Sequence, residues 1–193
     1  MSIMKTGSCM VKTAIVNVVA TASVSQKLDL KELSKFREIS YNSESYGGRV
    51  AYFKTASMEG SVSIFASGKM ISVGTKSEKK ASCELKSAMK FLVNKGFAKP
   101  VNLQSKVQNI VVSIDFERHI DLERLAVDKR VVYEPEQFPG AMMKLSRPFK
   151  ASILLFASGK AVIAGLKNSS EIEPIIEKLV ATTRHLLSKC APP

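Results

Sequence analysis

The pentapeptide FASGK occurs twice in this chain, at 65–69 and again at 156–160, an offset of 91 positions (156 − 65). Further identities flank it, at an offset of 92 before the pentapeptide and of 91 after it. They are Asn17/Asn109, Val19/Val111, Asp29/Asp121, Leu30/Leu122, Tyr41/Tyr133, Gly48/Gly140, Gly74/Gly165 and Lys76/Lys167. Self-similarity over such a distance indicates a duplicated structural unit, and it constrains the fold before any single motif does.

The repeat divides the 193 residues into two copies. One residue is gained in the first copy between Gly48 and Phe65. We predict five segments: an N-terminal tail at 1–10, a first repeat at 11–97, a linker at 98–105 that contains Pro100, a second repeat at 106–188 and a C-terminal tail at 189–193.

Each copy has the same order of local patterns. Segments 14–24 and 107–116 are rich in β-branched residues, which is typical of strands. Short helical patterns follow, with Asp29 and Asp121 placed to cap them. The segments around FASGK then predict hairpins in which Ser-Gly forms a two-residue turn.

A longer helical pattern closes each copy. In the first, Ser77 can cap the start and Gly96 the end. In the second, Ser170 and Glu173 fit a capping box. Many strands and few helices predict an α+β fold with an antiparallel sheet.

The expected sheet has more apolar surface than its helices can cover. Val18 and Ala20 share one face of the first strand, yet Val19 on the opposite face is also apolar, and Phe65 and Phe156 point away from Ile64 and Leu155 in the hairpins. A second layer formed by dimerisation or a sandwich would cover the extra face. The alternative is an apolar surface reserved for a partner.

Charge narrows the choice of partner. The chain has 29 Lys+Arg and 17 Asp+Glu, a net charge of +12, of which residues 1–100 carry +9 (16 − 7). This balance favours a polyanion such as nucleic acid. The minor groove of distorted DNA offers an apolar floor between rows of phosphate, so it suits a surface that is both apolar and basic.

Other classes of protein find little support. The longest apolar run, 151–157, is too short to span a membrane, and the N-terminus lacks the pattern of a secretory signal. The scattered Cys9, Cys83 and Cys190 favour a reducing compartment. No catalytic arrangement recurs in both copies and His119 and His185 have no ligand spacing, so we expect no enzyme, no metal and no cofactor.

The motifs resemble the core of the TATA-box-binding protein family over nearly the whole chain. QNIVVS (108–113), YEPEQFPG (133–140) and LLFASGKAVIAGLK (154–167) carry the resemblance in the second copy, and VNVVAT (16–21) and IFASGKMISVGTKSE (64–78) carry it in the first. The resemblance implies a saddle of two pseudo-symmetric repeats with a curved antiparallel sheet of about ten strands. Its concave underside would grip the minor groove, and the helices would lie on the convex back.

The same resemblance implies roles for individual residues. It places the DNA-binding surface at wedge residues, central asparagines, apolar floor residues and phosphate-binding lysines, namely Tyr46, Phe65, Phe138, Pro139 and Phe156; Asn17 and Asn109; Val19, Ile71, Val73, Val111, Leu154, Val162 and Ala164; and Lys69, Lys76, Lys160 and Lys167.

This sequence departs from the family pattern at several of these positions. Tyr46 stands where the family has a second phenylalanine, and Val73 and Ala164 replace threonines that donate to bases. Ser63 replaces an apolar floor residue, and Gly47 with Gly48 makes the first-copy loop divergent. A divergent paralogue that acts mainly as a regulatory protein-interaction module, with weak or non-TATA DNA binding, is therefore the alternative function.

The resemblance also implies protein partners. Glu134 and Glu136 match acids that recruit transcription factor IIB, and through it RNA polymerase, while Lys79, Lys86 and Lys90 lie where transcription factor IIA and other convex-face regulators bind. A homodimer is expected when DNA is absent. The basic balance favours a eukaryotic nucleus over an archaeal cytoplasm or nucleoid.

Overall fold

The computed structural model describes residues 2–6, 9–146 and 148–186. Its contacts divide the chain into two compact units. The first-copy unit is Asn17–Gln108, and the second-copy unit joins Met1–Val16 to Asn109–Pro193. The strand β2, Cys9–Ser23, contributes residues to both units. The boundaries of the units therefore differ from those of the predicted repeats, because residues up to Val16 pack with the second copy.

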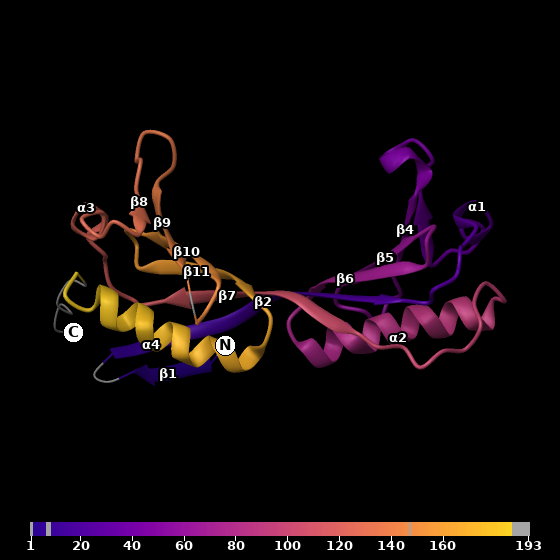
Figure 1. The fold of residues 1–193 in the computed structure, drawn as a ribbon, viewed down its shortest axis with the longest axis horizontal. Coiled ribbons are helices and arrows are strands. Elements are labelled where there is room, and N and C mark those ends of the chain that lie inside the picture. The colour runs from indigo at the N-terminus through magenta and orange to yellow at the C-terminus, as the bar shows by residue number, and fades with distance from the viewer. Residues whose placement is uncertain (1, 7–8, 147, 187–193) are drawn as a thin grey trace. The chain divides into compact units, whose positions relative to one another are not determined.

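The first-copy unit has strand order β3-β4-β5-β6-β2, with every pair antiparallel. Helix α2 lies along one face of these strands and contacts β5 and β6 (Figure 1). The remaining elements of this unit are α1 Leu30–Leu33, β3 Ile39–Tyr41, the 3-10 turn η1 Ser45–Gly48, β4 Val50–Phe53, β5 Ser61–Phe65, β6 Lys69–Thr75 and α2 Glu78–Asn94.

The second-copy unit repeats this plan with strand order β7-β11-β10-β9-β8. Strand β1, Ser2–Thr6, pairs with the beginning of β2 and contacts α4. The other elements are β7 Lys106–Asp115, α3 Leu122–Leu125, β8 Val131–Val132, β9 Gly140–Leu145, β10 Ala151–Phe156, β11 Lys160–Leu166, the 3-10 turn η2 Ser169–Glu171 and α4 Ile172–Thr183. The predicted α+β class with an antiparallel sheet is confirmed.

The N-terminal segment differs from the tail that the sequence predicts. Residues Ser2–Thr6 form β1, and β2 begins at Cys9. Residues 98–105 carry no helix or strand, and Leu103 within them is buried. The C-terminal tail predicted at 189–193, with Cys190, lies outside the described residues, whereas Cys83 is a free, exposed thiol.

Most predicted helix caps are present. Asp29 accepts hydrogen bonds from the backbone of Lys31 and Glu32, and Asp121 from that of Arg124. Ser77 caps α2, which ends near Gly96 at φ 79°. These short side chains satisfy backbone N–H groups that have no partner within the helix.

The capping box predicted for the last helix was wrong by two residues. Asn168 and Glu171 form it, rather than Ser170 and Glu173. The Asn168 side chain accepts from Ser170 N, and the Glu171 carboxylate accepts from Asn168 N at 3.3 Å. The box therefore starts η2, which precedes α4, so the chain enters the helix through a tighter turn.

The two copies of FASGK form turns of a kind other than the predicted two-residue Ser-Gly turn. Gly68 N donates to Phe65 O at 2.8 Å, so Ala66 and Ser67 are the central residues and Gly68 follows them at φ 84°. The second copy repeats this, with Gly159 at φ 85°. Glycine takes this left-handed conformation without steric cost.

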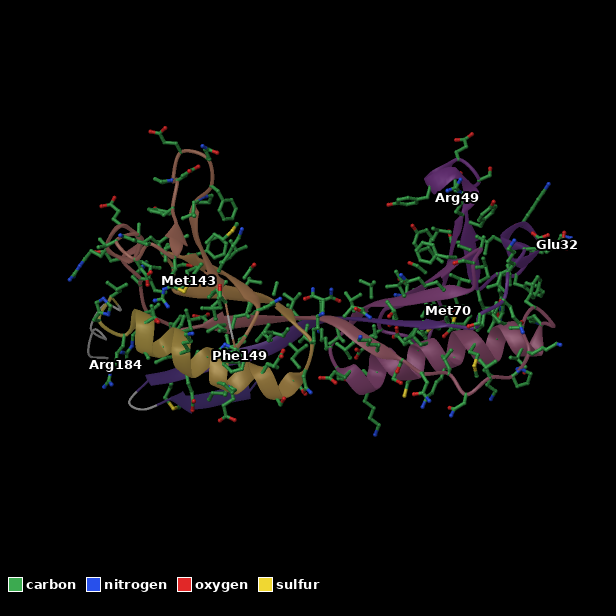
Figure 2. The ribbon with its side chains drawn as sticks, in the orientation of Figure 1. Glu32, Arg49, Met70, Met143, Phe149 and Arg184 are labelled. Carbon is green, nitrogen blue, oxygen red and sulfur yellow. The ribbon has the colours of Figure 1, made fainter. Side chains whose placement is uncertain are left out.

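The core lies between the helices and one face of each group of strands. Residues alternate along the strands, so one set faces the helix and the next set faces away. Met70 and Met143, labelled in Figure 2, belong to the buried set. No helix within residues 2–6, 9–146 and 148–186 is long and apolar enough to cross a membrane.

Strand pairing shows that Gly48 and Gly140, which sequence identity had matched, do not occupy equivalent positions. Ser40 pairs with Tyr52 and Val132 with Met142, so eleven residues (41–51) separate the first pair and nine (133–141) separate the second. Phe53 pairs with Val62 and Met143 with Ile153, and here the first copy is the shorter, with eight residues (54–61) between its pair against nine (144–152). Consequently Val50 lies opposite Phe65, where Gly140 lies opposite Phe156, and Gly48 is not the structural counterpart of Gly140.

Candidate nucleic-acid interface

Each unit leaves the face opposite its helix open. In the first-copy unit, Val18 and Ala20 are buried, while Asn17 and Val19 on the other face are partly exposed. The predicted floor and central residues all lie on the open faces: Asn17, Val19, Ile71 and Val73 in the first-copy unit, and Asn109, Val111, Leu154, Val162 and Ala164 in the second-copy unit. Ser63 also faces outward.

The two asparagines are oriented by glycines that lie in the bulged part of a strand. Gly74 N donates to Asn17 Oδ1 at 2.9 Å, and Gly165 N donates to Asn109 Oδ1 at 2.8 Å. The strand register shifts beside both glycines, which have φ of 95° and 102°. Because a backbone N–H must meet the amide oxygen, each bond fixes which end of the amide faces the glycine, and the Nδ2 group, which can only donate, is the end left free.

The FASGK turns are anchored by the backbone of the same unit. Leu28 N donates to Ala66 O and Val24 N donates to Gly68 O, at 2.9 and 3.0 Å. Ile120 and Phe116 make the equivalent bonds to Ala157 and Gly159, both at 3.0 Å. A Cβ on Gly159 would lie 2.0 Å from Arg118 O. The repeated pentapeptide thus fixes a turn between its phenylalanine and its lysine, and only glycine fits there.

The second copy holds an aromatic pair at its loop. The rings of Phe138 and Phe156 have centroids 6.0 Å apart at an interplanar angle of 62°. Gly140 lies beneath both rings, since a Cβ there would be 2.8 Å from Phe138 Cε1 and 3.1 Å from Phe156 Cε1. Phe138 and its neighbour Pro139 are exposed. The pair is therefore an apolar wedge at the surface, supported by a glycine that the sequence repeat had not singled out for this role.

The first copy does not assemble the same pair. Tyr46 is 75% exposed, at φ 51° within η1, and no ring contact joins it to Phe65 among the described residues. Val50, which pairs with Phe65, is buried. The Tyr41 hydroxyl donates to Gly48 O at 3.2 Å and closes the longer loop.

The predicted phosphate-binding lysines are all exposed. They are Lys69 and Lys76 in the first-copy unit and Lys160 and Lys167 in the second-copy unit. Lys69 and Lys160 each begin the strand that follows a FASGK turn, so the turn sets the position of both. Sequence reasoning missed one acidic neighbour, Asp115, which is the cross-strand partner of Lys160. Comparing the copies at an offset of 92 would have found it, because Ser23 stands at the equivalent position.

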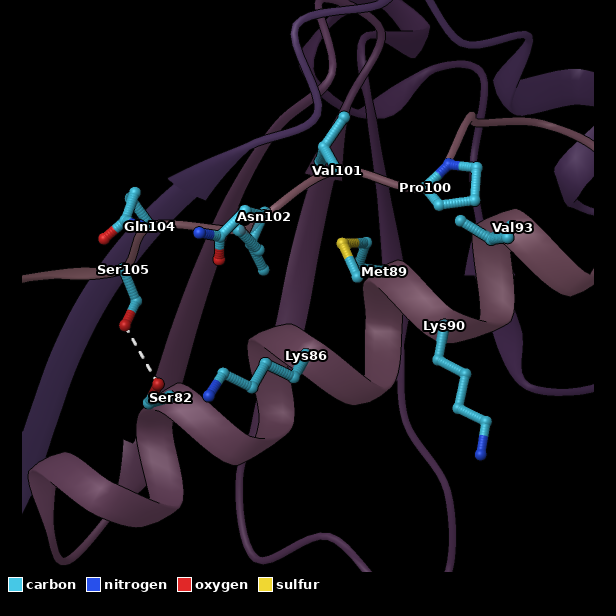
Figure 3. Close-up of a pocket in the computed structure, with 11 residues that line it drawn as sticks. Ser82, Lys86, Met89, Lys90, Val93, Pro100, Val101, Asn102, Gln104 and Ser105 are labelled. Carbon is cyan, nitrogen blue, oxygen red and sulfur yellow. Dashed lines mark hydrogen bonds between the residues drawn. The ribbon is translucent and has the colours of Figure 1, made fainter.

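The residues predicted to bind proteins lie away from the open faces. Glu134 and Glu136 are exposed in the loop between β8 and β9. Lys79, Lys86 and Lys90 are exposed on α2. Lys86 and Lys90 line a cavity of about 680 Å³ between α2 and residues 100–105, across which Ser82 and Ser105 share a hydrogen bond of 2.9 Å (Figure 3). Lys79 does not line this cavity.

Comparisons with known proteins agree with this geometry. The family model described as "Transcription factor TFIID (or TATA-binding protein, TBP)" matches residues 12–94 and 104–186. A TATA-box-binding protein of Cenarchaeum symbiosum is 38% identical over 159 residues, 82% of this chain and 86% of that protein. One of Aeropyrum pernix is 35% identical over 167 residues, 86% of this chain and 81% of that protein.

A solved structure gives the same answer for the fold. The structure described as Methanococcus jannaschii TBP matches with a TM-score of 0.79 and 31% identity, and the match covers 90% of this chain and 99% of that one. This family consists of DNA-binding transcription factors and is not an enzyme family. With both repeats matched in sequence and in structure, the chain belongs to the TATA-binding protein family.

Proposed function

We propose that this protein is a general transcription initiation factor that binds A/T-rich promoter DNA through the minor groove. The observation that carries the proposal is the pair of asparagines whose amide oxygens are occupied by Gly74 and Gly165. These bonds fix the orientation of both amides and leave the Nδ2 donors free for a partner. The floor of an A·T minor groove presents only acceptors, whereas a G·C pair adds the guanine amino donor. Donors on an apolar face suit A·T pairs.

Bending of the DNA follows from the wedge. Phe138 and Phe156 are packed against each other at the surface before DNA arrives. An apolar wedge of this kind inserts between base steps, partly unstacks them and kinks the duplex toward the major groove. Because the two rings are preorganised by Gly140, little side-chain freedom is lost on insertion.

Protein partners would then assemble on the surfaces that DNA leaves free. Glu134 and Glu136 are the proposed contacts for a transcription factor IIB homologue, which brings RNA polymerase. The lysines of α2 are the proposed contacts for regulators, including a factor like transcription factor IIA. In the absence of DNA, the apolar open faces favour a homodimer. Because the relatives described above are archaeal, we place the protein in a cytoplasm with a nucleoid rather than in a nucleus.

The second candidate function is a regulatory interaction module with weak DNA binding. Val73 and Ala164 favour it, because both face outward where a donor would be useful and neither can donate. Tyr46 favours it as well, since it is not packed into a wedge. Affinity for DNA separates the two candidates.

The test compares three duplexes of one length: A/T-rich, G/C-rich, and the G/C-rich duplex with inosine in place of guanine. Inosine lacks the amino group, so an I·C pair presents an A·T-like minor groove while the major groove stays G·C-like. We expect the A/T and I·C duplexes to bind similarly and the G·C duplex much more weakly.

The salt dependence provides a second measurement. Full phosphate contacts by Lys69, Lys76, Lys160 and Lys167 would give a slope of log K against log salt of about −3.6, which is the steepest slope we expect. Equal affinity for the G·C and I·C duplexes would refute minor-groove reading. Undetectable binding to all three would favour the regulatory module.

A further inference from the structure

The surroundings of the two FASGK lysines differ in charge. Lys69 is the cross-strand partner of Ser23, and Lys160 is the cross-strand partner of Asp115. Each pair lies on the open face of its unit. Ser23 is an even number of residues from Asn17 and Val19, and Asp115 from Asn109 and Val111, so each shares a face with them. Cross-strand neighbours on one face have their Cβ atoms within about 5.5 Å. A carboxylate therefore stands beside the second-copy lysine, and a hydroxyl beside the first-copy lysine.

The turn after each strand extends this contrast. Ser25 and Glu117 occupy equivalent positions, both at φ 54°, and their backbone N–H groups donate to Ser23 Oγ at 3.1 Å and to Asp115 Oδ1 at 2.8 Å. The backbone is thus the same while the charge is not. Residues 23–27 (SVSQK) carry one positive charge, whereas residues 115–119 (DFERH) carry two negative charges and one positive.

One cation offsets part of this negative charge. Lys12 on β2 forms an ion pair with Glu117, and that hydrogen bond, reinforced by the charges of Glu117 and Asp115, raises the pKa of Lys12. Asp115 is left beside Lys160 without an ion pair among the described residues. A phosphate that approaches Lys160 therefore also approaches Asp115, and repulsion between the two anions cancels part of the attraction.

The aromatic pair, in contrast, is present in the second-copy unit and absent from the described residues of the first-copy unit. The second-copy unit packs Phe138 on Phe156 over Gly140, and the first-copy unit places Val50 in the register of that glycine. A side chain at Val50 occupies the position over which a second ring would lie. Phe65 is therefore left as a single ring. The unit with the wedge has the weaker phosphate site, and the unit with the stronger phosphate site lacks the wedge.

We propose that the two units hold DNA by different physical means, insertion by the second-copy unit and phosphate attraction by the first-copy unit. This inference rests on the DNA binding proposed above. It makes the complex polar, with one kinked step and one electrostatic clamp, although the chain is an internal repeat. It also makes Gly140 and Val50 the positions that decide which unit kinks the DNA. Ser23 and Asp115 become the positions that decide which unit's phosphate contact depends more strongly on salt.

The charge half of the inference is tested with matched alanine variants on an A/T-rich duplex. Lys69→Ala should make the salt slope shallower by about 0.9, the value for one full phosphate contact. Lys160→Ala should change the slope by less than half as much. Asp115→Ser, which copies the first repeat, should make the slope steeper and should restore a full effect to Lys160→Ala. Equal slope changes for the two lysine variants would overturn the inference.

The insertion half is tested by moving a single 2-aminopurine along the same duplex, since its fluorescence rises when the base is unstacked. With the wild-type protein, 2-aminopurine fluorescence should rise strongly at one position in the duplex. Phe138→Ala and Gly140→Ala should abolish that signal, and Lys69→Ala should lower affinity without moving it. Phe138→Ala serves as the second variant because its side chain is exposed and its loss does not threaten folding.

The outcomes separate this inference from the function on which it rests. An equal rise of 2-aminopurine fluorescence at two duplex positions, with salt-dependent binding intact, would refute the proposal that the two units hold DNA by different means. It would not refute minor-groove binding. No binding at any salt concentration would overturn both. One strong position together with unequal lysine effects is the expected result.

Discussion

Replacing Asn109 with aspartate tests how the open face reads DNA. Aspartate has the same shape and keeps an acceptor for Gly165 N, which lies 2.8 Å from the present Oδ1. The backbone bond that shapes the bulge of β11 should therefore survive. The Nδ2 donor, however, is replaced by a second acceptor that carries negative charge. Folding and recognition are thereby separated in one substitution.

The expected loss of affinity follows from the lost donor. A base acceptor buried in the complex without a partner costs about 1–3 kcal/mol, which corresponds to about 5- to 140-fold in affinity. Repulsion between the carboxylate and the acceptors of the groove adds to this loss. We expect Asn109→Asp to weaken binding to an A/T-rich duplex at least about tenfold, while the melting temperature stays close to that of the wild type.

Fluorescence anisotropy at one fixed salt concentration measures the affinity, and thermal unfolding measures the stability. Asn17→Asp is the matched variant, because Gly74 N donates to Asn17 Oδ1 in the same way at 2.9 Å. Wild-type affinity in both variants would show that the amides do not donate to bases. A large fall in melting temperature would show instead that the Gly165 bond needs the neutral amide.

Three other changes have definite expected outcomes. Val73→Thr combined with Ala164→Thr should tighten binding to a TATA duplex more than to a scrambled A/T duplex, because each hydroxyl adds a donor on the open face; an unchanged ratio of the two affinities in a competition assay would contradict this. Charge reversal at Glu134 and Glu136 should abolish the gel-shift band of the ternary complex with the transcription factor IIB homologue and leave binary DNA binding intact, whereas loss of both would mean that the loop is needed for the fold. Gly159→Ala should lower the melting temperature, since φ is 85° and Arg118 O would lie 2.0 Å from the new Cβ, and unchanged thermal unfolding would refute this account of the turn.

Sequence reasoning identified those features of the fold that depend on local pattern. The repeat, the strands around Asn17 and Asn109, and the caps at Asp29, Asp121 and Ser77 follow from spacing and from the chemistry of short side chains. The alternation of buried and open residues is also present as predicted. The repeat is visible as sequence identity, and each of the other features involves residues close together in the chain, where the physical cause can be seen in the sequence.

The features that sequence reasoning missed depend on pairing between distant residues. β4 is shifted by two residues relative to the alignment that sequence identity gives, so Val50, rather than Gly48, lies opposite Phe65 and corresponds to Gly140. The first copy gains two residues before β4 and loses one after it, which leaves a net gain of one. A comparison without gaps detects only the net change and cannot locate the two separate changes. The bonds from Gly74 and Gly165 to the asparagines likewise span 57 and 56 residues, and no local motif predicts them.

The strand β2 has a consequence for how this chain can be divided. Its residues up to Val16 belong to the second-copy unit, yet in sequence they precede all of the first-copy unit. A fragment that starts in the linker 98–105 and runs to the C-terminus would lack the strand residues its own unit uses. The duplicated halves are therefore interdependent in folding, because completing the second-copy unit requires contacts between segments nearly one hundred positions apart. Contacts of such long sequence separation slow folding.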